Sequence, residues 1–261
     1  MRFFLERNKY KIEIVLLMVS LTFFSGSIQA ESTHKKLFYR TFVNREMYKW
    51  GELIHTFETN TPPKTIEQKL ELINYYYGYI GHLMNKKKQE TAEEYIDKGQ
   101  DLIDNVIKLS PHNHTALSYK GAFLGFKMGF SKVKAMYLAP KCMTEINKAY
   151  KLDHENTQII INKANLLFYS PSALGGDKEE ALKLYHRAMV LMEKNKETDQ
   201  NWNYLNLLTT IAIGFDKTDM PHESKKMYEK ILKLEPDFKW VRDDLYPNLL
   251  RKMQIKPVDR Q

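Results

Sequence analysis

The chain has 261 residues, of which 43% are hydrophobic and 28% charged, and its formal net charge is +8. This composition excludes a disordered tail and a protein with many membrane spans. Only 11 glycines and 9 prolines interrupt the chain, which favours helices over a β-sandwich, and the single cysteine excludes an internal disulfide and a four-thiolate zinc site.

Residues 1–30 have the pattern of an export signal. Basic residues precede an apolar run of 11 residues, Ile14–Phe24, and a short stretch of small and polar residues ends at Ala30. The basic residues are Arg2, Arg7, Lys9 and Lys11. The run is shorter than the roughly 20 apolar residues that cross a bilayer. We therefore expect a signal peptide, a mature chain without a transmembrane span, and export to the periplasm or cell envelope of a Gram-negative bacterium. A buried helix of the fold is the alternative, and the sequence leaves open whether the signal is cleaved.

Residues 31–64 predict one extra helix followed by a linker. The helix is expected over Arg45–Thr56, where apolar residues recur at helical spacing. It ends before Pro62 and Pro63, because a proline disfavours helical geometry in the residue that precedes it.

Residues 65–236 contain four similar units, each an apolar helix, a loop and a second apolar helix. The second helices end at Leu109, Leu152, Leu191 and Leu234, with spacings of 43, 39 and 43 residues. The first helices are expected over Leu70–Leu83, Ala116–Phe126, Thr157–Tyr169 and Tyr204–Phe215. Because no single pair can bury enough apolar surface, we expect neighbouring pairs to stack on one another.

The last unit resembles the tetratricopeptide repeat (TPR), whose small and large apolar residues recur at fixed positions. The matching residues are Leu208, Ile211, Ala212, Phe215, Ser224, Tyr228, Ile231 and Pro236. The second and third units match with insertions of nine and five residues between their helices. The resemblance implies an all-α, tetratricopeptide-like α-solenoid of antiparallel helix pairs, with long inter-helix insertions in some repeats.

Residues 237–261 predict a C-terminal capping helix and a tail. The helix is expected over Phe238–Lys252, where it would cover the open end of the last pair, and it is expected to bend at Pro247.

Four segments together resemble a group of exported repeat proteins of Bacteroidetes-type bacteria. They are Asn74–Gly81, Lys134–Asp153, Tyr169–Leu182 and Glu235–Pro247. This resemblance implies a scaffold of the cell envelope, which agrees with the export signal.

No residue pattern predicts catalysis, a metal site or a cofactor. His112 and His114 lie in a turn between helices without a third ligand, and Gly175-Gly176 lacks the phosphate-loop pattern. Cys142 occupies a position where the repeat places a small buried residue. Lys86–Lys88 is too short a basic run to predict nucleic-acid binding. We therefore expect a protein that is not an enzyme and does not bind nucleic acid.

The first helices of a tetratricopeptide solenoid line its inner wall, and we expect binding residues there. The candidates are Tyr75, Tyr79, Ser118, Phe126, Gln158, Asn165, Tyr169 and Asn206. Tyrosines and amides suit hydrogen bonds to a peptide backbone, to sugars or to small polar ligands, whereas the lysines and arginines that would grip an acidic peptide tail are missing. For the tyrosines, packing between helices is the alternative.

Two functions remain open at this point. The first is an exported, non-catalytic scaffold that binds a protein or peptide partner in the cell envelope. The second is an accessory that binds a small polar ligand and resembles the helical-repeat component of tripartite periplasmic transporters. The insertions at Gly125–Pro140 and Tyr169–Gly176 could line its pore or lid.

Overall fold

The computed structural model describes residues 34–60 and 62–255, and the expected signal peptide lies outside this part of the chain. The described residues contain helices and turns but no β-strand, as expected for an all-α fold. No helix among them is long and apolar enough to cross a membrane.

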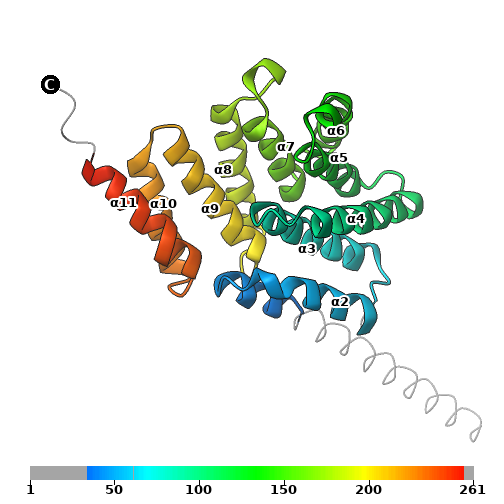
Figure 1. Ribbon diagram of the computed structural model, residues 1–261, viewed down its shortest axis with the longest axis horizontal. Coiled ribbons are helices and arrows are strands. Elements are labelled where there is room, and N and C mark those ends of the chain that lie inside the picture. Colours follow the sequence, from blue (N-terminus) through cyan, green and yellow to red (C-terminus); the bar gives the residue numbers. More distant parts are fainter. Residues whose placement is uncertain (1–33, 61, 256–261) are drawn as a thin grey trace, which may run out of the picture.

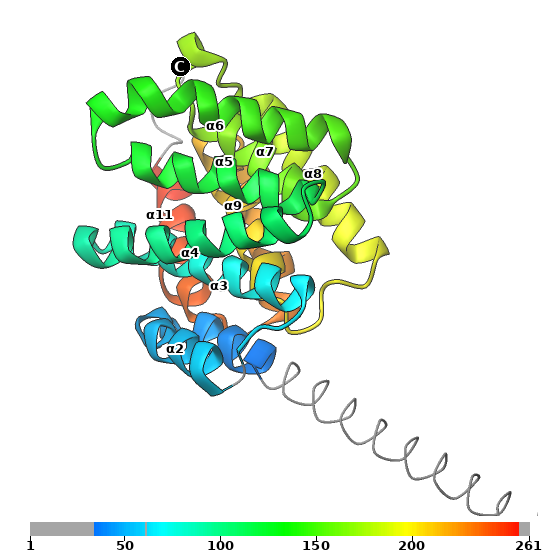
Figure 2. The same ribbon diagram turned by 90° about the vertical axis from the view of Figure 1, so that its right-hand side faces the viewer.

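Four consecutive helix pairs make up the solenoid, and each inner helix is followed by an outer one (Figures 1 and 2). The inner helices are α3 (Ile66–Asn85), α5 (His114–Met128), α7 (Thr157–Tyr169) and α9 (Trp202–Lys217). The outer helices are α4 (Gln89–Leu109), α6 (Lys132–Leu152), α8 (Lys178–Lys194) and α10 (Pro221–Leu234). The predicted α-solenoid of helix pairs is therefore confirmed.

Each inner helix begins at a side chain that accepts a hydrogen bond from the first helical turn. Asn113, Asn156 and Asn201 cap α5, α7 and α9, and Thr65 forms a capping box with Gln68 at the start of α3. These caps satisfy N–H groups that have no partner within the helix, so the local sequence fixes where each inner helix starts.

Glycines let the helices approach each other closely. A Cβ atom on Gly121 would lie 2.6 Å from Ile146 Cγ1 of the paired helix, and a Cβ on Gly99 would lie 2.2 Å from the Phe123 ring of the next pair. Any larger residue at either position would collide with its neighbour, so both glycines fix the spacing between helices.

The two insertions take different forms. The nine extra residues of the second unit are helical and lengthen α6 at its start. Pro140 lies inside this helix, and only residues 129–131 separate α5 from α6. The extra residues of the third unit form a loop over residues 170–177 that contains a short 3-10 helix, Ser172–Leu174.

The two ends of the described part of the chain depart from the simple helices that the sequence predicts. Residues 34–43 form a helix that the sequence pattern did not predict, and Arg45, the expected first residue of the next helix, adopts a left-handed φ of 63°. The chain continues as a 3-10 turn, Met47–Lys49, and as α2 (Trp50–Asn60). At the other end, a π-helical segment, Trp240–Leu245, leads into α11 (Tyr246–Ile255), where a bend at Pro247 was expected.

Candidate binding surface

The helical residues 34–43 and α2 form a hairpin, which we call the N-terminal hairpin. Trp50 donates a 2.8 Å hydrogen bond from its indole N–H to Thr41 Oγ1, and the His34 and Phe57 rings stack with their centres 4.7 Å apart. Contacts at both ends of the hairpin therefore hold its two helices side by side.

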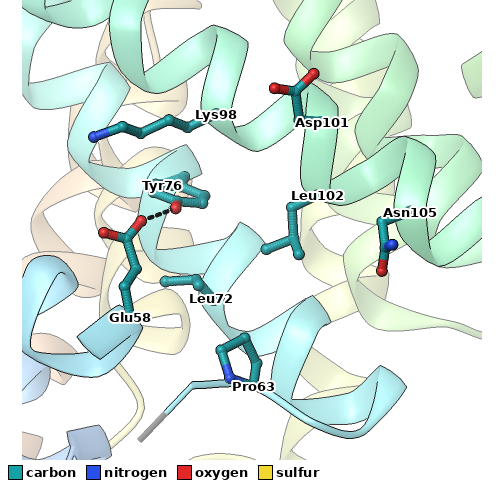
Figure 3. A pocket seen from close by; sticks show the side chains of 8 residues that line it. All are labelled: Glu58, Pro63, Leu72, Tyr76, Lys98, Asp101, Leu102 and Asn105. Carbon is teal, nitrogen blue, oxygen red and sulfur yellow. Dashed lines mark hydrogen bonds between the residues drawn. The ribbon is translucent and has the colours of Figure 1, made fainter. Parts of the chain in front are cut away.

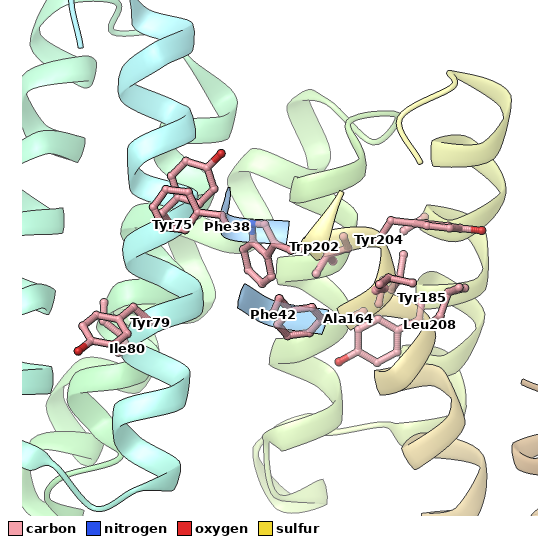
Figure 4. Close-up of a cluster of buried hydrophobic side chains, with 14 of the residues drawn as sticks. Phe38, Phe42, Tyr75, Tyr79, Ile80, Ala164, Tyr185, Trp202, Tyr204 and Leu208 are labelled. Atoms are coloured by element: carbon pink, nitrogen blue, oxygen red, sulfur yellow. The ribbon is translucent and has the colours of Figure 1, made fainter. Parts of the chain in front are cut away.

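The N-terminal hairpin joins the first helix pair to the last (Figure 4). The Phe38 ring stacks on Tyr75 of α3 with 3.6 Å between ring centres, and Phe42 packs against Trp202 of α9 and against Phe238. Tyr39 donates a 2.7 Å hydrogen bond to Glu235. The N-terminal hairpin therefore covers part of α3 and part of α9.

Because of this cover, the predicted binding residues of α3 lie in the core. Tyr75 and Tyr79 are both buried, and Tyr79 packs edge-on against Tyr95 of α4. A Cβ atom on Gly51 of α2 would lie 3.0 Å from the Tyr79 hydroxyl, which shows how closely the hairpin approaches. The expected open wall is closed at this end by the chain itself.

A buried chain of polar side chains crosses three inner helices. Asn203 of α9 donates to Gln158 at 2.8 Å, Gln158 donates to Asn162 at 3.0 Å, and Asn162 donates to Ser118 of α5 at 2.9 Å. Ser118 and Gln158, both predicted to bind a ligand, are therefore used within the fold. Buried amides with their hydrogen bonds satisfied fix the register between neighbouring helices.

The remaining four candidates reach the surface. Phe126, Asn165 and Asn206 are partly exposed, and Tyr169 is 68% exposed. The eight candidates thus do not form one open wall, which corrects the expectation from the sequence. A role in binding stays a prediction, and we restrict it to the four candidates that reach the surface.

Three of the four gather in one cluster with Tyr77 and Tyr185, two residues that are not among the eight predicted binding residues. Asn165 donates to the Tyr77 hydroxyl at 2.7 Å and accepts from the Tyr185 hydroxyl at 2.5 Å. The Phe126 ring centre lies 5.0 Å from that of Tyr77. Tyr169 lies close enough to Tyr77 and Tyr185 to interact electrostatically with their hydroxyl groups. We call these five residues the tyrosine–asparagine cluster.

The cluster joins α3 directly to α7, although α5 lies between them in the sequence. Tyr77 and Asn165 are 88 positions apart, so their hydrogen bond shows that the inner wall curves tightly. No local pattern could place Tyr185 of α8 against Asn165, because their contact depends on how α7 and α8 pack.

The electrostatics of the cluster keep its hydroxyl groups neutral. Burial, and then the neighbouring Tyr169, raise the pKa of Tyr77 well above its usual range, and burial does the same for the pKa of Tyr185. These tyrosines therefore act as hydrogen-bonding groups at neutral pH. A cation lies nearby, since Lys217 Nζ sits 5.6 Å from the ring centre of Phe168, next to Tyr169.

Cys142 has the properties of a structural thiol. It is buried, and burial raises its pKa to about 11, so the thiolate that would act as a nucleophile is scarce at neutral pH. Among the described residues, no group of three or more His, Cys, Asp or Glu side chains could hold a metal ion.

A separate open groove of about 480 Å³ lies between α2, α3 and α4 (Figure 3). Its apolar floor is formed by Pro63, Leu72, Tyr76 and Leu102, and its polar rim by Glu58, Lys98, Asp101 and Asn105. The Tyr76 hydroxyl donates a hydrogen bond to Glu58. None of the eight predicted residues lines this groove, because it depends on how α2 packs and not on the repeat pattern.

The chain has the fold of the tetratricopeptide-repeat proteins. The crystal structure of TTC0263, a thermophilic TPR protein of Thermus thermophilus, aligns with 85% of this chain and 99% of its own, at 11% sequence identity and a TM-score of 0.54. YrrB, described as a TPR protein with an unusual peptide-binding site, aligns with 89% of this chain and 98% of its own at 14% identity, but its TM-score of 0.36 is too low to support an argument. No protein-family model matches the sequence, and no curated protein matches it either.

Proposed function

We propose that the protein is an exported, non-catalytic scaffold that binds a protein or peptide partner in the cell envelope through the tyrosine–asparagine cluster. The tetratricopeptide fold supports a scaffold, and the pattern of residues 1–30 supports export. The cluster supports the location of the binding surface.

The observation that carries the proposal is the hydrogen bonding of Asn165. Its amide pairs with the Tyr77 hydroxyl on one side and the Tyr185 hydroxyl on the other. The amide donates to the Tyr77 hydroxyl and accepts from the buried Tyr185 hydroxyl, so the proton of the partly exposed Tyr77 hydroxyl has no acceptor within this triad. A carbonyl oxygen of a bound peptide would supply that acceptor.

The surroundings of the triad suit an uncharged segment of peptide backbone. Phe126 and the exposed Tyr169 supply aromatic faces against which peptide side chains can pack. Lys217 contacts the ring of Phe168, the residue before Tyr169, so a free carboxylate at the end of the peptide that pairs with Lys217 would lie beside Phe168 and not at the Asn165 triad.

The test begins with capture of partners from a cell-envelope extract by the immobilised full chain, followed by mass spectrometry. Synthetic peptides from the captured protein are then titrated against the wild type and two variants. Tyr77→Phe removes one hydroxyl and should raise Kd about 2- to 10-fold, the effect of one hydrogen bond. Tyr169→Ala should raise Kd further, because it removes a whole aromatic face.

Tyr48→Ala is the matched control, since Tyr48 is as exposed as Tyr169 but lies in the N-terminal hairpin region. Binding that is equal in Tyr48→Ala, Tyr77→Phe and Tyr169→Ala would remove the cluster from the proposal. A peptide that binds only with a free terminal carboxylate would move the site toward Lys217.

The groove between α2, α3 and α4 favours a second candidate function, the binding of a small polar ligand by a transport accessory. Its volume lies within the range of small-molecule sites, and it combines an apolar floor with groups of both charges. Thermal-shift screening with organic acids, sugars and lipids tests this function. A ligand of the groove should stabilise the wild type but not Leu102→Arg, and stabilisation of both would place the ligand elsewhere.

A further inference from the structure

The first turns of α6 carry an exposed apolar face. Val133, Met136 and Tyr137 are 66%, 76% and 75% exposed, and Pro140 continues the same face. Cys142, Ile146 and Ala149 of the same helix are buried, and helical spacing places them on the opposite side. These exposed side chains therefore do not hold α6 to the solenoid.

The second insertion carries another exposed apolar side chain. Leu174, in the loop over residues 170–177, is 56% exposed. The loop passes close to α6, since a Cβ atom on Gly175 would lie 4.0 Å from Met143 Cε. We call Val133, Met136, Tyr137, Pro140 and Leu174 the insertion patch. All five residues belong to the two insertions, which the repeat does not need in order to pack its helix pairs.

The first turns of α6, which carry most of the patch, are basic. Between residues 105 and 144 the sequence contains no Asp or Glu, but it contains six lysines, at positions 108, 120, 127, 132, 134 and 141. Lys120 and Lys127 form ion pairs with Asp104 and Asp97 of α4. Lys132, Lys134 and Lys141 lie in the same turns of α6 as the patch, so basic residues stand at both ends of its apolar stretch.

We propose that the insertion patch docks the protein onto the surface of an anionic lipid bilayer. Apolar side chains that project from a basic helix enter the boundary between headgroups and acyl chains, and tyrosine is enriched at that depth. The lysines attract anionic headgroups, and salt screens this attraction. A second copy of this chain fits the patch less well, because two basic surfaces would repel each other.

The test places an environment-sensitive fluorophore on the patch of the full chain. In a Cys142→Ala background, Tyr137→Cys carries the label, and Leu234→Cys, an exposed leucine of α10, carries it in the control. Vesicles of phosphatidylcholine mixed with phosphatidylglycerol are compared with vesicles of pure phosphatidylcholine. The emission of the label at position 137 should shift to the blue with the mixed vesicles alone, the shift should weaken as salt is added, and the label at position 234 should not respond.

This readout separates the patch from residues 1–30, whose apolar run could bring the chain to any vesicle. The proposal is contradicted if the label at position 137 stays in a water-like environment while the protein sediments with the mixed vesicles. It is also contradicted if the label shifts without vesicles as the protein concentration rises, which would indicate self-association.

A second variant checks the contribution of the side chains themselves. Changing Val133, Met136 and Tyr137 together to serine should lower partitioning to the mixed vesicles at least about tenfold, because it removes most of the inserted apolar area. The melting temperature should not change, since all three side chains are exposed. Partitioning equal to the wild type would overturn the proposal.

Discussion

The inner wall of this solenoid has two parts that differ in what lies over them. The faces of α3 and α9 that meet the N-terminal hairpin are covered, and Tyr75 lies there in the core. In the tyrosine–asparagine cluster near the end of α7, Tyr185 is buried, but Phe126 and Asn165 are partly exposed and Tyr169 is exposed. Equivalent positions of a repeat therefore become core or candidate site according to what the rest of the chain places against them.

The largest effect is expected from opening the covered part. Phe38→Ala removes a fully buried ring that stacks on Tyr75, and it should lower the free energy of unfolding by about 3–5 kcal/mol. Leu37→Ala is the control, because Leu37 lies on the same helix but is exposed. Urea denaturation measures both, and equal losses would mean that the hairpin does not contribute to the core.

A smaller loss is expected from the buried polar chain. Gln158→Leu removes the partner of the Asn162 side-chain oxygen and of the Asn203 side-chain NH2, so the free energy of unfolding should fall by about 1–3 kcal/mol. Tyr169→Ala, on the open part, should leave stability almost unchanged and weaken binding instead. A stable Gln158→Leu variant would show that the polar chain is not needed for the register of the inner helices.

The spacing of the helix pairs gives a further check. Gly121→Leu should push α5 away from α6 and cost about 1–3 kcal/mol of stability, because Ile146 and the backbone of Cys142 leave no room. Gly81→Ala on α3 is the matched control, since no atom lies within 4 Å of its Cβ position. An unchanged melting temperature for Gly121→Leu would contradict the packing of the second pair.

The smallest effect on stability is expected from a change of pH, and it arises in the N-terminal hairpin. Burial lowers the pKa of His34 below its ordinary value of 6.5, so the folded hairpin favours the neutral imidazole. The unfolded chain then binds more protons as the pH falls through 6.5, and stability should decrease slightly. His34→Phe should remove this contribution, and calorimetry at several pH values compares the two proteins. A wild-type decrease that persists unchanged in the variant would assign the titration to another group.

The repeat pattern carried enough information to predict the helix pairs, because apolar periodicity and capping residues act locally. For example, Asp177 caps α8 by accepting a 2.9 Å hydrogen bond from the Glu180 N–H, only three residues further on. The contact between Tyr39 and Glu235 joins residues 196 positions apart and has no local signature. The candidate site was therefore predicted only in part. Phe126, Asn165 and Tyr169 were selected from repeat positions, whereas Tyr77 and Tyr185 depend on the curvature of the assembled solenoid.

Hydroxyl-radical footprinting of the free chain tests the division of the inner wall most directly. Tyr169 should be oxidised as rapidly as the exposed Tyr137, and Tyr75 should be as protected as the buried Tyr119. Rapid oxidation of Tyr75 would mean that the N-terminal hairpin does not cover the wall, and it would contradict the division of the wall into a covered and an open part.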